Sequence, residues 1–440
     1  MSQILLTNLR IINPFGDVEF IEKGTIEISD GSIVSAGAEL TDSAPDIQKI
    51  DMAGKTVLPG MINAHTHLYS SLALGMPPPQ NNPANFTEIL KQVWWKLDRA
   101  LDEDSTRASF QVGLLNALKN GVTTLVDHHS SQNFIDGSTR QLVELADTFG
   151  IRIATAFEIS DRNGNDTFAS GLDENLTAIH EFAHREHIHP MLGLHASFTL
   201  SDKSLKAIGR ELENLTGTGI HIHVAEDLAD ERDAKMKGYH SVIQRLDKFN
   251  LLNEHSLIIH GIHMEKTDID LILKRGAQLV HCPTSNANNR VGNLSPLVVR
   301  KLNAGLGTDG MQSNMLKEAK EGTLIRSASL PGGVESVNYL KLLFQNNRAI
   351  AEKMFNQKLG KIESGYPADL VFYDYCPVTE LNDTNWQGHA LFGFESPTDV
   401  ITRGLFRIKN GKLAGIDENE IFNNAQSESR RLWQSMKNVT

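Results

Sequence analysis

The chain has 440 residues, of which 40% are hydrophobic and 22% charged, and its formal net charge is −12. Such a composition is typical of a globular protein with a large core and room for a smaller one. The acidic balance and the lack of a basic run with interleaved aromatics argue against nucleic acid binding. No apolar stretch reaches the length of a membrane span, no signal peptide is evident, and two cysteines give no disulfide framework. We therefore expect a cytoplasmic protein that binds neither nucleic acid nor membrane.

The two ends of the chain are both expected to form short β-strands. Residues 1–59 alternate apolar and polar side chains at 4–12 and 25–29, and Asp30-Gly31 supplies a hairpin turn. Residues 362–440 contain a strand at 369–373, a second hairpin turn at Asn410-Gly411, and an amphipathic surface helix from about Glu418. Because neither end is long enough for a good core alone, we predict one β-sandwich domain built from both.

Strands and helices alternate between residues 60 and 361. The expected strands are 56–64, 122–127, 151–158, 191–195, 220–224, 257–260, 278–282 and 305–308, and helices are expected at 88–100, 104–119 and 202–215. This alternation predicts an α/β protein with a parallel (β/α)₈ TIM-type barrel. An open doubly wound sheet is the alternative, although no Gly-x-Gly-x-x-Gly motif follows the early strands.

Histidines recur where the expected strands end. The first strand ends in His65 and His67, whose side chains lie on one side of a strand and can bind one metal ion together. Later strand ends carry His195, His223 and His260. Because the carboxyl ends of the strands hold the active site of such a barrel, the pattern predicts a metal-dependent site there. A turn that happens to contain two histidines is the simpler reading of the first pair alone.

These motifs resemble the amidohydrolase superfamily over nearly the whole chain. The matching segments are Pro59-Gly60 before His65-x-His67, His223-x-x-Glu226, His260-Gly261, 281–286, 307–310 and 360–371. Within the superfamily, the chain is similar to the cytosine, methylthioadenosine and triazine aminohydrolase branch. Segments 94–98, 127–129 and 161–163 are most similar to aminohydrolases associated with selenium metabolism.

The resemblance implies one divalent metal ion, with zinc as the first choice and iron as the alternative. Its ligands would be His65, His67, His223 and Asp309. One ion rather than two is expected, because the fourth strand offers no lysine for carbamylation. Asp309 would also accept a proton from the metal-activated water, and Glu226 would carry a proton to the ring nitrogen. His260 would orient the hydroxide or stabilise the developing charge.

Four residues are expected to bind substrate: His195, Trp94, His129 and Asn286. His195 matches a position that contacts the substrate ring in adenosine-type deaminases. Adjacent residues on a helix point in different directions, so at most one of Trp94 and Trp95 is expected to face the ligand. A strand likewise turns only one of His128 and His129 inward. Asn286 either contacts substrate or shapes the turn after the seventh strand.

The expected function is hydrolytic deamination of an amino-substituted nitrogen heterocycle of purine or pyrimidine type. The enzyme would be a hydrolase of non-peptide C–N bonds, a cyclic amidine deaminase that uses a metal-activated hydroxide. A small-molecule heterocyclic substrate and a homo-oligomeric state follow from the resemblance. Two alternatives stay open: hydrolysis of a ring amide or aryl chloride in the same site, and a catalytically silent binding scaffold.

Overall fold

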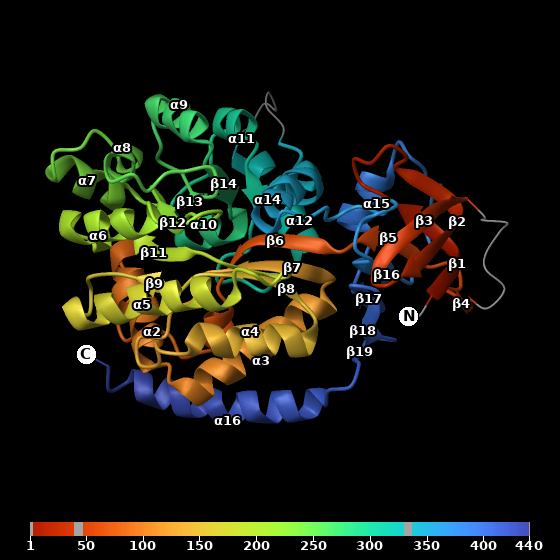
Figure 1. Cartoon of the computed structure of the whole chain (residues 1–440), viewed down its shortest axis with the longest axis horizontal. Coiled ribbons are helices and arrows are strands. Elements are labelled where there is room, and N and C mark those ends of the chain that lie inside the picture. The colour runs from red at the N-terminus through yellow and green to blue at the C-terminus, as the bar shows by residue number, and fades with distance from the viewer. Residues whose placement is uncertain (1–2, 39–46, 330–336, 440) are drawn as a thin grey trace.

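The computed structural model describes residues 3–38, 47–329 and 337–439. It contains an α/β barrel with a smaller β domain beside it (Figure 1). Red strands from the start of the chain and blue strands from its end lie together in this smaller domain, while the last helix returns along the barrel. The fold class predicted from the sequence is confirmed.

The smaller domain is a nine-stranded sheet made from both chain ends. Its strands are β1 (Gln3–Ile12), β2 (Phe20–Ser29), β3 (Ser32–Ala38), β4 (Gln48–Asp51), β5 (Thr56–Pro59), β16 (Leu370–Tyr373), β17 (Asp399–Thr402), β18 (Leu405–Lys409) and β19 (Lys412–Leu413). The order is β19-β18-β17-β16-β5-β1-β2-β3, with β4 beside β1. The antiparallel pair β5–β16 joins the two ends, and Leu6, Ile26, Leu370 and Phe372 share one apolar core.

Both predicted hairpin turns are present. Asp30 and Gly31 connect β2 to β3, and Asn410 and Gly411 connect β18 to β19. All four residues have positive φ angles, between 51° and 79°, as a two-residue type I′ turn requires. Asparagine, aspartate and glycine tolerate this left-handed backbone better than other residues, so the local sequence determines where the chain reverses.

Eight strand positions form the barrel, all in parallel register with their neighbours. In order they are β6 (Met61–Thr66), β7 (Val122–Asp127), β8 (Arg152–Thr155) with β9 (Glu158–Ile159), β10 (Ile188–Pro190) with β11 (Leu192–Ala196), β12 (Ile220–Val224), β13 (Leu257–His260), β14 (Gln278–His281) and β15 (Gly305–Leu306). The third and fourth positions are each interrupted. A parallel bridge between Thr66 and Asp309 links the last position back to the first.

The expected strand at 56–64 is two strands in two different sheets. β5 pairs with β1 and β16 in the smaller domain, whereas β6 pairs with β7 in the barrel. The change of sheet occurs at Gly60, where a Cβ atom would lie 2.2 Å from Thr123 Oγ1. A continuous apolar run hides this change, because both strands are buried. The predicted domain limits 1–59, 60–361 and 362–440 remain predictions.

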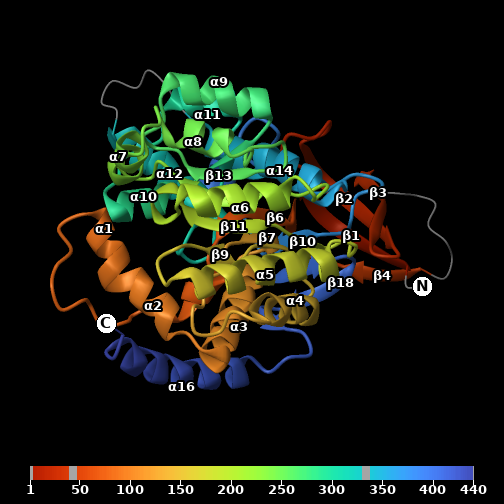
Figure 2. The ribbon, with the colours of Figure 1, turned by 60° about the vertical axis from the view of Figure 1, so that its left-hand side comes forward.

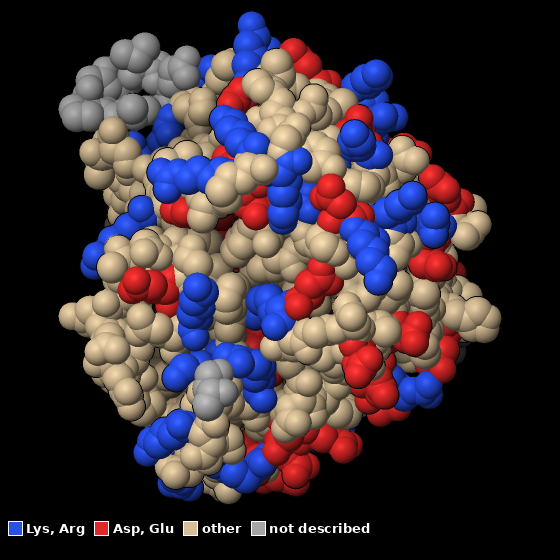
Figure 3. Space-filling view, turned by 90° about the vertical axis from the view of Figure 1, so that its left-hand side faces the viewer, with Lys and Arg blue, Asp and Glu red and all other residues tan. Residues whose placement is uncertain are grey.

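Helices surround the barrel strands. They are α3 (Glu103–Lys119), α4 (Ser138–Phe149), α5 (Asn165–Phe182), α6 (Asp202–Leu212), α7 (Leu228–Met236), α8 (Val242–Lys248), α9 (Lys266–Arg275), α10 (Pro283–Asn289), α11 (Pro296–Leu302), α12 (Met315–Ser329), α13 (Tyr339–Lys341) and α14 (Asn347–Phe355), with α15 (Trp386–Phe392) in the connection to β17. Two further short turns are η3 (Ser197–Thr199) and η4 (Leu342–Asn346). No described helix is long and apolar enough to cross a membrane. Acidic and basic side chains are interspersed over the face in Figure 3.

The segment after β6 forms one wall of the barrel mouth. It contains the 3₁₀ helix η1 (Leu68–Ala73), α1 (Phe86–Ile89), the π-helical turn η2 (Leu90–Trp94) and α2 (Trp95–Ala100). The C-terminal helix α16 (Glu418–Met436) runs beneath α3 near α2 (Figure 2). Its Trp433 Nε1 donates a 3.0 Å hydrogen bond to the Leu72 carbonyl in η1. The last helix therefore supports this wall from behind.

Candidate active site

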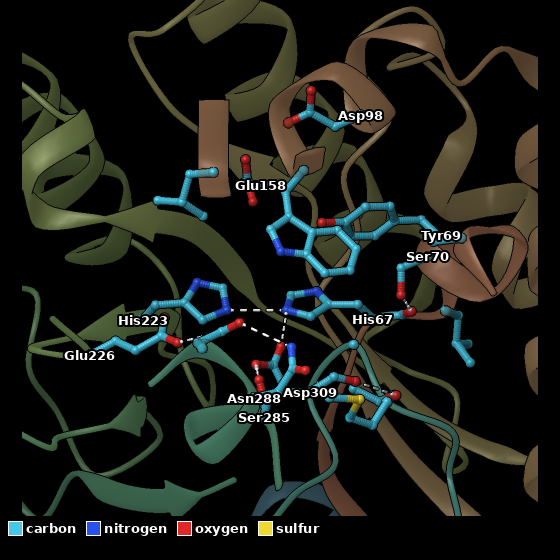
Figure 4. A pocket seen from close by; sticks show the side chains of 18 of the residues that line it. His67, Tyr69, Ser70, Asp98, Glu158, His223, Glu226, Ser285, Asn288 and Asp309 are labelled. Atoms are coloured by element: carbon cyan, nitrogen blue, oxygen red, sulfur yellow. Dashed lines mark hydrogen bonds and ion pairs between the residues drawn. The ribbon is translucent and has the colours of Figure 1, made fainter. Parts of the chain in front are cut away.

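A cavity of about 400 Å³ lies at the carboxyl ends of the barrel strands. Strand ends supply Thr66, His67, His223, His260 and Asp309 to its lining, and the segment from η1 to α2 supplies the facing wall. Figure 4 shows His67, His223, Glu226 and Asp309 gathered at one side of this cavity. The cavity is therefore where the predicted barrel active site should be.

The four predicted metal ligands converge on one point. His65, His67, His223 and Asp309 each offer one donor atom, and these atoms all lie within 4.8 Å of one another. His67 Nε2 is 2.9 Å from Asp309 Oδ1 and 3.3 Å from His223 Nε2, and His65 Nε2 is 3.6 Å from the same Asp309 oxygen. Three imidazoles and one carboxylate are a donor set that suits zinc or ferrous iron.

Hydrogen bonds on the far side of two of the rings turn their inner nitrogens toward the common point. His67 Nδ1 donates to the His128 carbonyl at 2.6 Å, and His223 Nδ1 donates to the His195 carbonyl at 2.7 Å. In neutral rings the two Nε2 atoms are then acceptors that face each other, an arrangement that a cation would stabilise. The buried His65 Nε2 likewise has no hydrogen-bond partner among the described residues, and burial lowers the pKa of His65 to about 3. These side chains fit a metal ion.

The backbone at the end of β15 brings Asp309 to the histidines. Gly307 passes so close to β6 that a Cβ atom would lie 2.8 Å from the Cβ of His65. The amide nitrogens of Thr308 and Asp309 then both donate to the His65 carbonyl. Asp309 itself has a left-handed backbone, with φ of 55°. Strain of this kind, roughly 1–3 kcal/mol, is often found at functional positions.

The two oxygens of Asp309 have different partners. Oδ1 faces His67 and His65, whereas Oδ2 accepts a hydrogen bond from the Ser285 hydroxyl and lies 3.9 Å from His260 Nε2. Burial opposes ionisation of this carboxyl, but the neighbouring His65 and His67 rings hold its pKa well below the usual value. Asp309 is therefore an ionised ligand with its second oxygen turned toward the reaction space.

Glu226 and His260 lie together beside this carboxylate. His260 Nε2 is 3.4 Å from Glu226 Oε2, and the other Glu226 oxygen accepts from Asn289 Nδ2 at 3.1 Å. Burial, and next the charge of Asp309, raise the pKa of Glu226 well above its usual value. Burial also lowers the pKa of His260 to about 4. Burial thus favours the uncharged form of both groups.

Two of the four predicted substrate-binding residues line the cavity. His195 does so, and its Nδ1 donates to Thr199 Oγ1, since that hydroxyl already gives its proton to the Ala196 carbonyl. The His195 Nε2 is thus left as an acceptor. Trp94 and Trp95 both line the cavity, so the expectation that at most one of them faces the ligand stays a prediction. Neighbouring residues about a quarter-turn apart can both border a wide cavity.

The other two predicted substrate-binding residues lie behind the cavity wall. His129 is fully buried, packs against Phe110 and Phe157, and its Nε2 contacts Ser131 Oγ. Neither His129 nor His128 is among the described lining residues. Asn286 is also fully buried, and its amide nitrogen donates to His260 Nδ1 at 2.9 Å. Strand alternation predicts which way a side chain points but not how deep it lies.

The sequence reasoning assigned no role to two acidic residues of the facing wall. Asp98 on α2 and Glu158 on β9 both line the cavity, and Figure 4 shows them together, apart from Glu226 and Asp309. Asp98 is one turn after Trp94 and Trp95 on a helical segment, so helical spacing could have placed it on their face. Glu158 begins β9, after a break in the third barrel strand that the sequence does not show.

Comparisons with known proteins give the same picture. Residues 56–411 match the model of the amidohydrolase family. The chain belongs to this family. It is 29% identical over 453 residues to a 5′-deoxyadenosine deaminase of Methanopyrus kandleri, which covers 99% of both chains. It is 26% identical to a 5-methylthioadenosine/S-adenosylhomocysteine deaminase of Archaeoglobus fulgidus, over 92% of this chain and 96% of the relative. The predicted superfamily and branch are thereby confirmed.

Solved structures share the fold of this amidohydrolase. An adenosine deaminase from Xanthomonas campestris with bound zinc has a TM-score of 0.84 at 20% identity, and the match covers 98% of this chain and 99% of that one. An atrazine chlorohydrolase from Arthrobacter aurescens complexed with zinc has a TM-score of 0.82 at 21% identity, covering 97% and 100%. These identities are too low to carry a substrate from one protein to the other.

Proposed function

We propose that this amidohydrolase deaminates an amino-substituted nitrogen heterocycle of the adenosine type by hydrolysis. The observation that carries the proposal is the position of the Glu226 carboxyl, buried beside Asp309 and His260 at the edge of an intact four-ligand metal site, where burial raises its pKa. Replacing a ring-bound amine by water requires a proton at the ring nitrogen, and a carboxyl with a raised pKa can supply it. Relatives named as adenosine-type deaminases support the same choice.

One divalent ion, zinc first and iron second, would be held by His65, His67, His223 and Asp309. When bound, such an ion lowers the pKa of water from 15.7 toward about 7 and so supplies hydroxide at neutral pH. The zinc in two structural neighbours supports the choice of metal. Burial lowers the pKa values of His65 and His223, so these two imidazoles can bind without first losing a proton, whereas Asp309 raises the pKa of His67, which would release a proton as the ion binds.

The surrounding side chains can each move or hold a proton. Glu226 donates its proton to the ring nitrogen beside the carbon under attack. Asp309 accepts a proton at Oδ2, the oxygen that already accepts from Ser285. Because Asn286 donates to His260 Nδ1, the neutral His260 ring carries its proton on Nε2 and can donate it to negative charge that develops on the attacked carbon's oxygen. His195, an acceptor at Nε2, can receive an N–H of the heterocycle.

A second candidate reaction is loss of chloride from a triazine ring. The structural similarity to an atrazine chlorohydrolase favours it, but only at the level of the fold. Chloride is a leaving group that needs no proton, so a protonated Glu226 fits loss of an amine better. Hydrolysis of a ring amide and a silent binding scaffold rank lower, because the ligands and proton-handling residues are all present. The cytoplasmic location stays a prediction from the composition, and the homo-oligomer and the link to selenium metabolism stay predictions from the resemblance.

Ammonia release by the zinc-loaded protein tests the proposal. The panel should include 5′-deoxyadenosine, methylthioadenosine, cytosine and an amino- and chloro-triazine pair, with zinc counted on the same preparation. Ammonia from a purine nucleoside, abolished in Glu226→Gln with zinc retained, is the expected result. Chloride release without ammonia would replace the deaminase by the second candidate.

A further inference from the structure

The walls of the cavity carry many acids and no fixed positive charge. Six carboxyl residues line it, and no lysine or arginine is among its described lining residues. The six are Asp98, Glu158, Glu226, Asp227, Asp230 and Asp309. A metal ion would offset the charge near Asp309, but it lies at the opposite side from Asp98 and Glu158 (Figure 4). The electrostatic character of that far side is therefore set by its own residues.

Four of the six carboxyl groups already have a role. Glu226 and Asp309 belong to the reaction centre described above. Asp227 accepts from the Ala229 amide at the start of α7, and Asp230 accepts from the amides of Ala225 and Phe198. Asp98 and Glu158 remain, and among the described residues no backbone amide donates to either side chain.

A single arginine holds these two carboxylates in place. Arg162 Nη1 and Nη2 both donate to Asp98 Oδ2 at 3.0 Å, Nη2 also donates to Glu158 Oε1, and Nε donates to Ser160 Oγ. Four of the five guanidinium N–H groups are thus committed. The guanidinium stacks on Trp95 at 4.8 Å, and Arg162 is not among the described lining residues of the cavity. It is a clamp behind the wall and not a receptor for an anionic ligand.

One oxygen of Asp98 is left over. Asp98 lines the cavity but is only 2% exposed, and its Oδ1 is itself buried and has no hydrogen-bond partner among the described residues. Two carboxylates against one guanidinium leave one negative charge. The other nearby arginine, Arg99, donates to the Trp95 carbonyl. A buried carboxylate oxygen without a donor is costly unless a proton or a ligand completes it.

We propose that Asp98 and Glu158 form a cation subsite, which binds an ammonium or amidinium group on the part of the substrate remote from the leaving amine. A charged N–H donor beside Glu158, with the buried Asp98 oxygen behind it, would balance the excess negative charge that Arg162 leaves. A carboxylate or phosphate at the same place would meet two carboxylates and no free cation. Burial raises the pKa of Asp98 to about 7 and also raises the pKa of Glu158. Without a cationic ligand, the pair therefore tends to bind a proton to balance its negative charge.

Three adenosine analogues that differ in charge at one position test the subsite. They are 5′-amino-5′-deoxyadenosine, which is cationic, neutral 5′-deoxyadenosine and anionic adenosine 5′-carboxylate. Binding is measured by calorimetry on zinc-loaded Glu226→Gln protein, so that turnover does not interfere. We expect the cation to bind about tenfold or more tightly than the neutral compound, and the anion most weakly. Equal affinities, or tightest binding of the neutral or anionic analogue, would overturn the proposal.

Two variants separate ligand recognition from structural support. Asp98→Asn keeps an acceptor for Arg162 but loses the negative charge, so the ratio of cation affinity to neutral-ligand affinity should fall to near one. Glu158→Gln should also reduce this ratio. Asp173→Asn, on the exposed face of α5, is the matched control and should keep it. If none of the three nucleosides binds, benzamidine and benzamide make the same comparison. A benzamidine preference that is absent, or that persists in Asp98→Asn, contradicts the subsite.

The cation subsite rests on the proposed function only in that its ligand is taken to be the substrate of the deaminase. The two proposals can therefore fail separately. Ammonia release from 5′-deoxyadenosine by the wild-type protein reports on the deaminase alone. A cation preference without ammonia release would keep the subsite and remove the deaminase. Ammonia release without any cation preference would do the reverse.

Discussion

The two sides of the cavity are built in different ways. The metal side consists of strand ends, where parallel pairing and close backbone contacts such as Gly307 against His65 fix each side chain. The facing wall consists of η1, the π-helical turn and α2, held by Arg162 from the turn after β9 and by Trp433 from α16. The barrel thus determines where chemistry occurs, while packing between distant segments determines what fits there.

The largest effect is expected on the metal side. His223→Ala removes one of four ligands, so bound zinc should fall from about one per chain to near zero, and hydrolytic activity should fall with it. Metal analysis of purified protein measures this. His184→Ala, an exposed histidine after α5, is the control and should retain the ion. Full zinc content in His223→Ala would break the assignment of the ligand set.

Glu226→Gln should separate chemistry from metal binding. The amide cannot deliver a proton, so turnover should drop roughly 10²- to 10⁴-fold while zinc content stays the same. Steady-state kinetics and metal analysis on one preparation test this. Glu144→Gln on the exposed face of α4 serves as a control. Retained turnover in Glu226→Gln would exclude the proton transfer that we assign to this carboxyl.

Asn286 contacts His260 in the reaction centre without lining the cavity, so its substitution distinguishes an effect on catalysis from an effect on substrate binding. Asn286→Ala removes the donor to His260 Nδ1, so kcat should fall about tenfold while KM and zinc content change little. Asn214→Ala, on the surface after α6, should leave kcat unchanged. A rise in KM with kcat preserved would instead favour direct substrate contact.

The facing wall should respond to pH through Asp98. In the unfolded chain this carboxyl loses its proton near 3.8, and in the folded protein near 7. Between these values the folded state holds more protons, so the contribution of Asp98 to stability falls as pH rises. The melting temperature of Asp98→Asn relative to wild type should therefore increase between pH 4 and pH 8, by at least about 2–4 °C. A difference independent of pH would contradict the raised pKa.

The smallest effect is expected at the support of the wall. Trp433→Phe keeps the aromatic packing of α16 but loses the hydrogen bond to the Leu72 carbonyl, worth about 0.5–1.5 kcal/mol. We expect KM to rise a few-fold, with kcat and zinc content unchanged. Chemical denaturation and kinetics together test it, and an unchanged KM would show that η1 holds its position without α16.

Sequence reasoning succeeded where the structure depends on local spacing. The alternation of His65 and His67 on β6, and the turn residues Asn410 and Gly411, determine geometry within a few residues. It failed where geometry depends on distant parts of the chain. The burial of His129 depends on Phe110 and Phe157, and the role of Asp98 depends on Arg162. The continuous apolar run at 56–64 could not reveal that it passes through two sheets.

The sheet shared by both chain ends also constrains how the protein is made. Asn13 donates a hydrogen bond to Glu363, which lies 350 residues further along the chain. The strand β16, which pairs with β5, is synthesised only after all the barrel strands. Such distant pairings form slowly, and until then an apolar strand edge is open to other chains. A chain that lacks β16 would therefore expose the apolar edge of β5, and yield during expression should depend on chaperones that shield that edge.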